Sequence, residues 1–323
     1  MTPRFWPNMR RVEILTFPDS QLLDVTGPLQ VFASANEILE MSGKQPAYET
    51  LVVATASRVR TATGLVLETA PLPKADAMVD TLIVAGGRGV NAACEDASLV
   101  EWVIGRSGNA RRTASVCSGA FLLAAAGLLD GRKAVTHWDR CEEFARRFPA
   151  VHLDPDPIFI RDGDVWTSAG VTAGIDLALS FVEADLGRRT ALAVARELVV
   201  FLKRPGGQSQ FSATLKLQQG DERFERLHAW ILENLPSDLS LAALAARANM
   251  SPRSFSRHYR LATGRTPARA IEEIRTEAAR RLLEQGLSVS QVSRRCGFGS
   301  QETMRRSFLR IVGTGPSAYR ERF

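Results

Sequence analysis

The sequence predicts two domains of different class, an α/β domain with a parallel sheet followed by an all-α domain. Strand-like and helix-like segments alternate up to residue 204 of the 323-residue chain, which is typical of a parallel sheet with helices on both faces. The remaining residues hold helix-like segments, arranged as two short helix-turn-helix units joined by a longer helix. A polar stretch that begins at Pro205 separates the two parts.

Short runs of apolar and β-branched residues predict the strands of the first domain, and segments of helical periodicity alternate with them. The expected strands are residues 12–17, 48–54, 81–85 and 113–116. The expected helices are residues 22–39, 99–107, 118–129 and 190–204. The helix at 118–129 is apolar on all sides, which indicates that it is buried.

Length and local composition place the domain boundary. A chain of 323 residues exceeds the usual size of a single domain. Pro205-Gly206-Gly207 breaks the preceding helical pattern and opens the polar stretch. We therefore expect an α/β domain at 1–204, a linker at 205–221 and a helical domain at 222–323.

Two segments of the helical domain repeat one plan, in which a serine caps a short helix and a second capped helix follows after a turn. In the first segment, Ser240 caps the short helix and Ser251-Pro252 starts the next one, because proline favours the first helical position. In the second segment, Ser288 and Ser300 cap the two helices. This is the helix-turn-helix plan, whose second helix lies in the major groove of DNA.

A longer helix joins the two units. Thr266-Pro267 open it and Gly286 closes it. About 18 residues at about 1.5 Å per residue span about 27 Å. A rod of this length can hold two recognition helices about one DNA turn apart, roughly 34 Å. Its apolar stripe is expected to pack both units against the rod; the stripe consists of Ile271, Ile274, Ala278, Leu282 and Leu283.

The positive charge of the chain is concentrated in its helical domain. Residues 222–323 contain 18 arginines, no lysine and 10 acidic residues, whereas residues 1–221 contain 23 basic and 25 acidic residues. The net charge of +6 therefore lies in the helical domain. This distribution favours a polyanionic partner for that domain alone. On charge alone, a solvated basic face without a partner is the alternative.

The helical domain resembles the AraC family of transcription regulators over about 100 residues, in LAARANMSPRSFSRHYRLATGRTP and VSQVSRRCGFGSQETMRRSFLRIVGTGPSAYR. The resemblance implies base-facing residues on each second helix, namely Arg253, Ser256 and Arg257 in the first unit and Gln301, Glu302, Thr303 and Arg306 in the second. The chemistry agrees, because arginine suits guanine, glutamine suits adenine and glutamate accepts from cytosine. A phosphate contact and mere solubility both stay open for four further arginines, Arg280, Arg281, Arg294 and Arg295.

In the first domain, an expected strand ends on Cys117 and a helix begins at Ser118. A thiol on such an elbow faces a helix N-terminus, which is expected to expose it and lower its pKa. Gly86-Gly87 follow another strand and can bring backbone amides close together, as an oxyanion hole requires. Asp24 lies at the start of the first helix. Because the carboxyl ends of parallel strands meet in one crevice, we expect these residues to share one pocket.

This domain resembles the ThiJ/PfpI superfamily from about residue 10 to 190, in FPDSQLLDVTGPLQVF, SVCSGAFLLAAAGLLDGRKAVTHW and GVTAGIDLALSFVE. The resemblance implies a flavodoxin-like sheet, and the pairing with an AraC-type tail is the arrangement of GlxA-like regulators. The domain is also similar to isonitrile hydratases, where an acid at the position of Asp24, the elbow cysteine and a threonine act together; Ser118 stands at that last position. Proteases and deglycases of the superfamily carry histidine there instead. His137 is a candidate substitute base, with a structural or pocket-wall role as the alternative.

Two classes of function compete. The first is a sequence-specific regulator of transcription, and more narrowly an activator, controlled by a small nitrogenous metabolite in a pocket formed by Asp24, Gly86, Gly87, Cys117, Ser118 and His137. The second is a cysteine-dependent hydratase or amidase with a DNA-binding tail. We favour a regulator that is not an enzyme, because no histidine adjoins the thiol and a metabolic enzyme has no use for two recognition helices. For Cys117, a vestigial or ligand-contacting thiol, residual catalysis and redox sensing stay open.

The expected partners are double-stranded DNA, the effector, a second copy of the chain bound through the first domain, and RNA polymerase. No cofactor or metal is expected, because the four cysteines lack CxxC spacing. No apolar stretch reaches the roughly 18–20 residues of a membrane helix, and residues 1–11 do not resemble a signal peptide. We therefore expect a cytoplasmic protein with reduced thiols.

Overall fold

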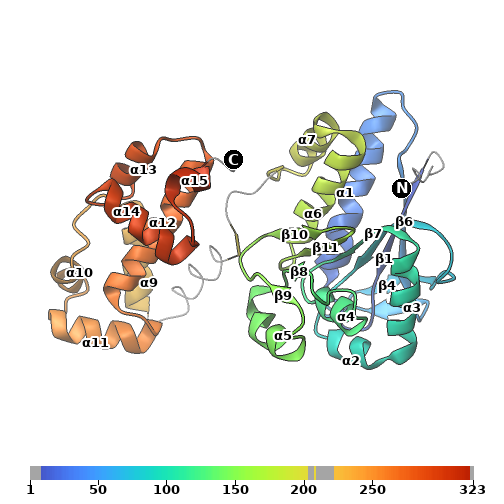
Figure 1. Ribbon diagram of the computed structural model, residues 1–323, viewed down its shortest axis with the longest axis horizontal. Coiled ribbons are helices and arrows are strands. Elements are labelled where there is room, and N and C mark those ends of the chain that lie inside the picture. Colours follow the sequence, from blue (N-terminus) through green and yellow to red (C-terminus); the bar gives the residue numbers. More distant parts are fainter. Residues whose placement is uncertain (1–8, 203–206, 209–221, 321–323) are drawn as a thin grey trace. The chain divides into compact units, whose positions relative to one another are not determined.

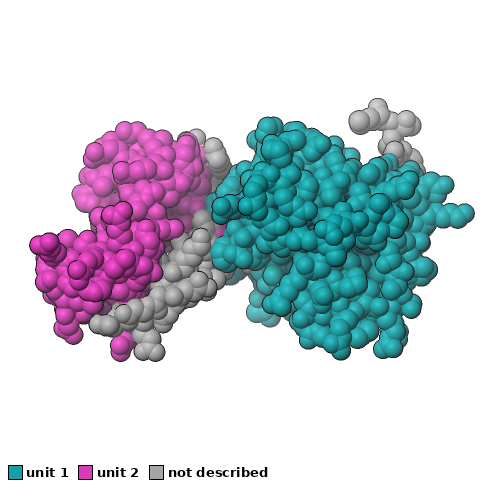
Figure 2. All heavy atoms as spheres, turned by 90° about the horizontal axis from the view of Figure 1, so that it is seen from below, with its two compact units in different colours: residues 1–204 teal, residues 205–323 magenta. Residues whose placement is uncertain are grey.

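The computed structural model describes residues 9–202, 207–208 and 222–320. The chain forms two compact units, residues 1–204 and residues 205–323 (Figure 2). Apart from residues 207–208, the predicted linker at 205–221 lies outside the described residues.

A seven-stranded sheet forms the centre of the first unit (Figure 1). Its spatial order is β10-β11-β7-β6-β1-β2-β5, and every neighbouring pair is parallel except β10 with β11. The parallel α/β prediction is therefore confirmed. The strands are β1 (Arg10–Leu15), β2 (Tyr48–Ala54), β5 (Ala70–Pro71), β6 (Val79–Val84), β7 (Ala110–Ser115), β10 (Phe159–Asp162) and β11 (Val165–Ser168).

Helices cover both faces of this sheet, as Figure 1 shows. One face packs against α2 (Val90–Glu95), α3 (Ala97–Gly108), α4 (Gly119–Ala125) and α5 (Cys141–Arg147). The other packs against α1 (Leu22–Met41), α6 (Ala173–Leu186) and α7 (Arg188–Glu197). Successive residues of β6 serve the two cores in turn, since Leu82 and Val84 face one and Ile83 faces the other.

Two predicted helices end earlier than expected, and each end has a local cause. The helix predicted to run to 129 ends at Ala125, because Gly127 adopts a φ of +69° and its amide bonds back to Ala124. The helix predicted to run to 204 ends at Glu197. There Val199 adopts a φ of +55° and the amide of Val200 bonds to the carbonyl of Ala195, which closes the helix in a left-handed turn.

Small elements complete the unit. The strands β3 (Arg58–Arg60) and β4 (Val66–Glu68) form an antiparallel pair, and β8 (Lys133–Ala134) pairs in parallel with β9 (His152–Leu153). The short 3-10 helix η1 (Trp138–Arg140) precedes α5. None of these was predicted, because runs of two to four residues carry little periodicity.

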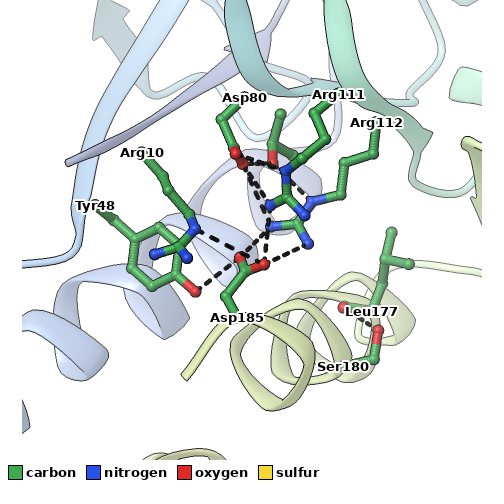
Figure 3. A network of polar contacts seen from close by, with 9 residues as sticks. Arg10, Tyr48, Asp80, Arg111, Arg112, Leu177, Ser180 and Asp185 are labelled. Atoms are coloured by element: carbon green, nitrogen blue, oxygen red, sulfur yellow. Dashed lines mark hydrogen bonds and ion pairs between the residues drawn. The ribbon is translucent and has the colours of Figure 1, made fainter. Parts of the chain in front are cut away.

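A network of buried charges closes the edge of the sheet where its strands begin (Figure 3). Asp185, near the end of α6, accepts hydrogen bonds from Tyr48 Oη at 3.0 Å, Arg111 Nη2 at 2.8 Å and Arg112 Nη2 at 2.5 Å. Asp80 accepts a further bond from Arg111 Nε at 2.7 Å. The network therefore joins β2, β6 and β7 to α6.

The second unit is all-helical, as predicted. Its helices are α9 (Glu222–Glu233), α10 (Leu241–Arg247), α11 (Pro252–Thr263), α12 (Pro267–Glu284), α13 (Val289–Arg295), α14 (Gln301–Val312) and α15 (Pro316–Arg320). It has two cores, and α12 serves both: Ile271 and Ile274 join the first, Ala279 and Leu283 the second. The sequence pattern did not predict α9 and α15. These two helices complete the cores, α9 through Phe224 among other side chains.

Serine and threonine side chains cap the helices of this unit as the sequence predicted. Ser240, Ser251, Thr266 and Ser300 each accept a hydrogen bond from a backbone amide three residues later. Ser288 forms a full capping box with its third helical residue. Across the described parts of the chain, no helix is long and apolar enough to span a membrane.

Candidate functional site

Three strand ends bring the predicted pocket residues together. Asp24 lies in the first turn of α1, which follows β1, and its side chain is fully buried. Gly86 follows β6, and its amide donates to Asp24 Oδ2 at 2.9 Å. A side chain at Gly86 would have its Cβ 2.6 Å from the amide nitrogen of Ser118 and 2.9 Å from Asp24. Glycine is therefore required for this close approach.

Cys117 lies on a strained elbow between β7 and α4. Its φ is +57°, a conformation that non-glycine residues rarely adopt. Three backbone contacts hold it there: its amide donates to the carbonyls of Ser168 and Ala169 at 3.1 and 3.0 Å, and its carbonyl accepts from Thr136 Oγ1 at 3.0 Å. Strain that is held in place by surrounding contacts is frequent at functional sites.

The expected exposure and low pKa of the Cys117 thiol are wrong. The residue is only 7% exposed. Burial and the neighbouring Asp24 raise the pKa of the thiol to about 12, although bonds from Val171 and Ser118 partly offset the rise. The helix N-terminus belongs to α4, a helix of only seven residues, and its favourable field does not compensate for lost hydration.

Asp24 is the second perturbed group of the site. Burial raises the pKa of its carboxyl to about 7, while the Gly86 amide and the Cys117 thiol lower it in part. No cation among the described residues forms an ion pair with this carboxyl. The site therefore holds one carboxyl that is close to half-protonated at neutral pH.

The glycine amides do not form a free oxyanion hole, contrary to the expectation from sequence. The Gly86 amide is used by Asp24. The Gly87 amide donates to Ser118 Oγ at 2.9 Å, and the same hydroxyl donates to the Gly87 carbonyl at 3.2 Å. A substrate oxygen would have to displace these two side chains before it could accept from either amide.

His137 borders the site without joining the thiol. Its Nδ1 accepts from the Asp139 amide at 3.2 Å, and its ring packs on Gly170, where a Cβ would lie 2.2 Å from Cδ2. Burial lowers the pKa of the imidazole. The structure thus places His137 against the loop that holds the Cys117 amide.

That loop is a component of the site that the sequence analysis did not name. It connects β11, which ends at Ser168, to α6 and contains Ala169, Gly170 and Val171. Val171 adopts a φ of +38°, which is unusual for a β-branched residue, and its amide interacts with the Cys117 sulfur. The motif GVTAG carried the signal, because a glycine before a helix start permits such a close approach.

The second candidate site is the surface of α11 and α14. In α11, Arg253 and Arg257 are exposed and Ser256 is half-buried. The three residues line a depression of about 730 Å³ beside α10. The buried partners of this helix, Phe255 and Tyr259, lie on its opposite side in the first core. The predicted reading face of α11 is therefore free to meet a partner.

In α14, the four predicted reading residues are also exposed, but three of them contact other side chains of the helix or its cap. Glu302 binds Arg305 through two contacts of 2.8 and 2.9 Å and lies 3.8 Å from Arg306. The hydroxyl of Thr303 lies 3.0 Å from Ser300 Oγ and takes part in the helix cap. Gln301 is exposed in the first turn.

The sequence left two roles open for Arg280, a phosphate contact or mere solubility, and the structure gives it neither. It is 8% exposed and bonds to Tyr319 Oη at 3.2 Å and to Glu277 at 3.2 Å. It therefore belongs to the packing of α12 against α15.

A close contact joins the turn of the second helix-turn-helix unit to the segment that precedes the first. Gly297, in the turn between α13 and α14, has a φ of +72°, and a Cβ there would lie 2.1 Å from the carbonyl oxygen of Leu235. Arg275 of α12 donates to the same carbonyl at 3.0 Å. The turn of the second unit therefore packs against the segment that leads into the first unit.

Comparison with known families agrees with this architecture. The sequence profile of the DJ-1/PfpI family matches residues 10–184, and that of a helix-turn-helix domain matches residues 244–322. A crystal structure of a ThiJ/PfpI family protein from Pseudomonas syringae is similar with a TM-score of 0.52 and 28% identity, covering 63% of this chain and 85% of that one.

Among the described residues, no group of three acidic, histidine or cysteine side chains could hold a metal ion.

Curated relatives include regulators and one enzyme. The HTH-type transcriptional regulator Rv1931c of Mycobacterium tuberculosis is 36% identical over 76% of this chain and 96% of its own length. The HTH-type transcriptional regulator GlxA of Rhizobium meliloti is 29% identical over 98% of this chain and 97% of its own. Isonitrile hydratase of Pseudomonas putida is 34% identical over 58% of this chain and 77% of its own. The chain therefore belongs to the AraC-type helix-turn-helix transcription regulators that carry an N-terminal DJ-1/PfpI domain.

Proposed function

We propose that this protein is a sequence-specific DNA-binding activator of transcription, controlled by a small nitrogenous metabolite that binds at Asp24 and Cys117. The observation that carries the proposal is the pair of exposed helices α11 and α14 on one helical domain, in two units that share α12. Arg253, Arg257 and Arg306 present guanidinium groups on these helices, and arginine is the commonest reader of guanine.

The electrostatics of the first domain support a nitrogenous effector. Asp24 is a buried carboxyl with a pKa of about 7 and no cationic partner in the described part of the chain. A protonated amine beside it would stabilise the carboxylate and supply the missing charge. An effector that binds one conformation of Asp24 and Cys117 better than another would shift the population of the DNA-binding state.

The alternative is a hydratase or amidase that acts through Cys117. The identity with isonitrile hydratase over 58% of this chain favours it. Two features of the site argue against efficient catalysis. The thiol has a pKa of about 12 and is therefore almost wholly protonated at neutral pH, and both glycine amides already have side-chain acceptors.

The proposal includes the other expected partners. A homodimer through the first domain would present two helical domains to DNA, as the symmetric sites of many regulators require. Contact with RNA polymerase would account for activation, and a cytoplasmic location is part of the same proposal.

The test is selection of duplexes from a random-sequence library by the full-length protein. We expect one preferred sequence with two conserved blocks about one helical turn apart. Arg257→Ala and Arg306→Ala should each cost about 1–3 kcal/mol of specific binding and should relax base preference in different blocks. Fluorescence anisotropy of labelled selected and random duplexes measures both effects.

Two results would contradict the proposal. A selection that yields no preferred sequence would remove sequence-specific recognition. Equal losses on selected and random duplexes would mean that the two arginines contact phosphate alone.

A further inference from the structure

A groove between α12 and α14 is a feature of the second unit that the reading residues do not explain. It has a volume of about 890 Å³. The two helices pack against each other (Figure 1), and the groove runs beside the predicted reading face, since Thr303 and Arg306 form part of its wall.

The lining of this groove is strongly basic. Four arginines and one acidic residue contribute to it, namely Arg269, Arg275, Arg306, Arg310 and Glu272. The lining itself therefore carries three positive charges in excess, while Glu273 and Glu302 outside it pair with Arg269 and Arg306. A concave surface of one sign concentrates ions of the opposite sign, so the geometry favours an anionic occupant.

Glu272 keeps two of these arginines in position. It accepts from Arg310 Nη2 at 2.5 Å and from Arg269 Nη1 at 3.2 Å, and the buried hydroxyl of Ser307 donates to it at 2.8 Å. The carboxylate is 18% exposed, whereas the side chain of Arg310 is 59% exposed. The arginines are therefore oriented toward a negative group and remain accessible to a second one.

The position of the groove beside α14 indicates that the anion is the phosphate backbone of DNA. A recognition helix in the major groove is flanked by the two phosphate backbones. Arg310 lies one helical turn beyond Arg306, toward the end of α14, and Arg269 lies in the first turn of α12 across the groove. A volume of 890 Å³ is larger than a single inorganic anion requires and is open to a continuous polyanion.

We propose that the groove between α12 and α14 binds backbone phosphates of DNA through Arg269 and Arg310, which exchange their contacts with Glu272 and, for Arg269, also with Glu273 for contact with phosphate. The proposal rests on the DNA-binding function and assigns part of its affinity to residues outside the reading faces. Such contacts position the protein on the duplex without reading sequence.

The experiment measures binding of the full chain to a labelled random-sequence duplex of about 30 base pairs, three helical turns. The salt concentration is varied from about 50 to about 200 mM. The double variant Arg269→Ala/Arg310→Ala should lower the slope of log Kobs against log salt by about 2, on random and selected duplexes alike. The charge-matched control Arg132→Ala/Arg188→Ala removes two arginines from surface ion pairs of the first unit and should leave the slope unchanged.

A second variant keeps the test independent of any loss of folding. Glu272→Gln retains an acceptor for Ser307 and removes the competing charge. It should tighten binding to random DNA by about two- to fivefold. An unchanged affinity of Glu272→Gln, or an unchanged slope of the double variant, would overturn the phosphate site.

The outcomes separate this inference from the function on which it rests. A protein that selects a DNA sequence and loses preference with Arg257→Ala, but keeps its salt slope in the double variant, retains its function without the phosphate site. A double variant that binds DNA normally and fails only to activate a reporter would assign the groove to RNA polymerase and contradict the proposal. A wild-type protein that binds no duplex would contradict both.

Discussion

The two edges of the parallel sheet hold buried acidic groups in opposite ways. At the edge where the strands begin, burial alone would raise the pKa of Asp185, but Arg112 and Arg111 lower it below its usual range. At the edge where the strands end, burial raises the pKa of Asp24 to about 7, and no described cation opposes it. The carboxylate at the first edge is paired with arginines, whereas the carboxyl at the second edge has no cationic partner among the described residues.

Backbone conformation follows the same division. Cys117 and Val171, two of the five described non-glycine residues with a positive φ, both lie at the edge with the uncompensated carboxyl. The edge around Asp185 is built from side chains of regular strands and one helix. Strain and an unpaired buried carboxyl therefore coincide at the edge where a ligand is expected, which supports a division into a stabilising edge and a sensing edge.

The largest expected effect lies at the stabilising edge. Asp185→Ala removes one of the two carboxylates that Arg111 and Arg112 share, from a site where Asp185 is 2% exposed, and leaves Arg112 with Asp80 at 3.6 Å. Removing one partner of a buried ion pair costs about 3–5 kcal/mol. The free energy of unfolding of the first domain, measured by urea denaturation, should fall by that amount.

A matched surface pair provides the control for this prediction. Asp164 binds Arg132 at 3.0 Å with both side chains exposed. Asp164→Ala should cost less than about 1 kcal/mol. Similar losses for the two variants would mean that the network around Asp185 does not stabilise the fold.

A smaller, pH-dependent effect is expected at the sensing edge. The pKa of Asp24 is raised in the folded state to about 7, from an unfolded value near 4. Between these values the folded state keeps a proton that the unfolded state loses, so the wild type loses stability as the pH rises from about 4 to about 7. Asp24→Asn removes this titration.

Denaturation of the wild type and of Asp24→Asn between about pH 4 and pH 8 measures the effect. The stability of the variant relative to the wild type should rise by a few kcal/mol over this range, at about 1.4 kcal/mol per pKa unit, and should level off above about pH 7. A difference that does not change with pH would show that Asp24 has an ordinary pKa and that the two edges do not differ.

Local features of the sequence were sufficient for much of the fold. Alternating strand and helix signals predicted the parallel sheet, and Ser240, Ser251 and Ser288 marked helix starts that the structure confirms. The end of α7 was missed because Val199 takes a left-handed turn that usually calls for glycine. The helix α9 was missed although it completes the first core of the second unit.

The candidate site was predictable in its members and not in its electrostatics. Strand ends identified Asp24, Gly86 and Cys117 as neighbours, since topology brings the carboxyl ends of parallel strands together. The pKa of the thiol could not be predicted, because it depends on burial and on hydrogen bonds made by the loop at Val171, more than 50 residues later in the chain. Desolvation is a property of the packed structure and leaves no local pattern in the sequence.

The central claim is that the sensing edge binds a ligand that controls the DNA-binding domain, and that it does not convert this ligand chemically. The smallest expected effect tests this claim. One preparation of the wild type and one of Cys117→Ala are assayed for turnover of isonitriles, amides and glyoxals, and for binding to the selected duplex. The account predicts equal DNA affinity and no Cys117-dependent turnover, because the thiol has a pKa of about 12 and the glycine amides are occupied. Substantial turnover that disappears in Cys117→Ala would contradict the account and establish the hydratase or amidase alternative.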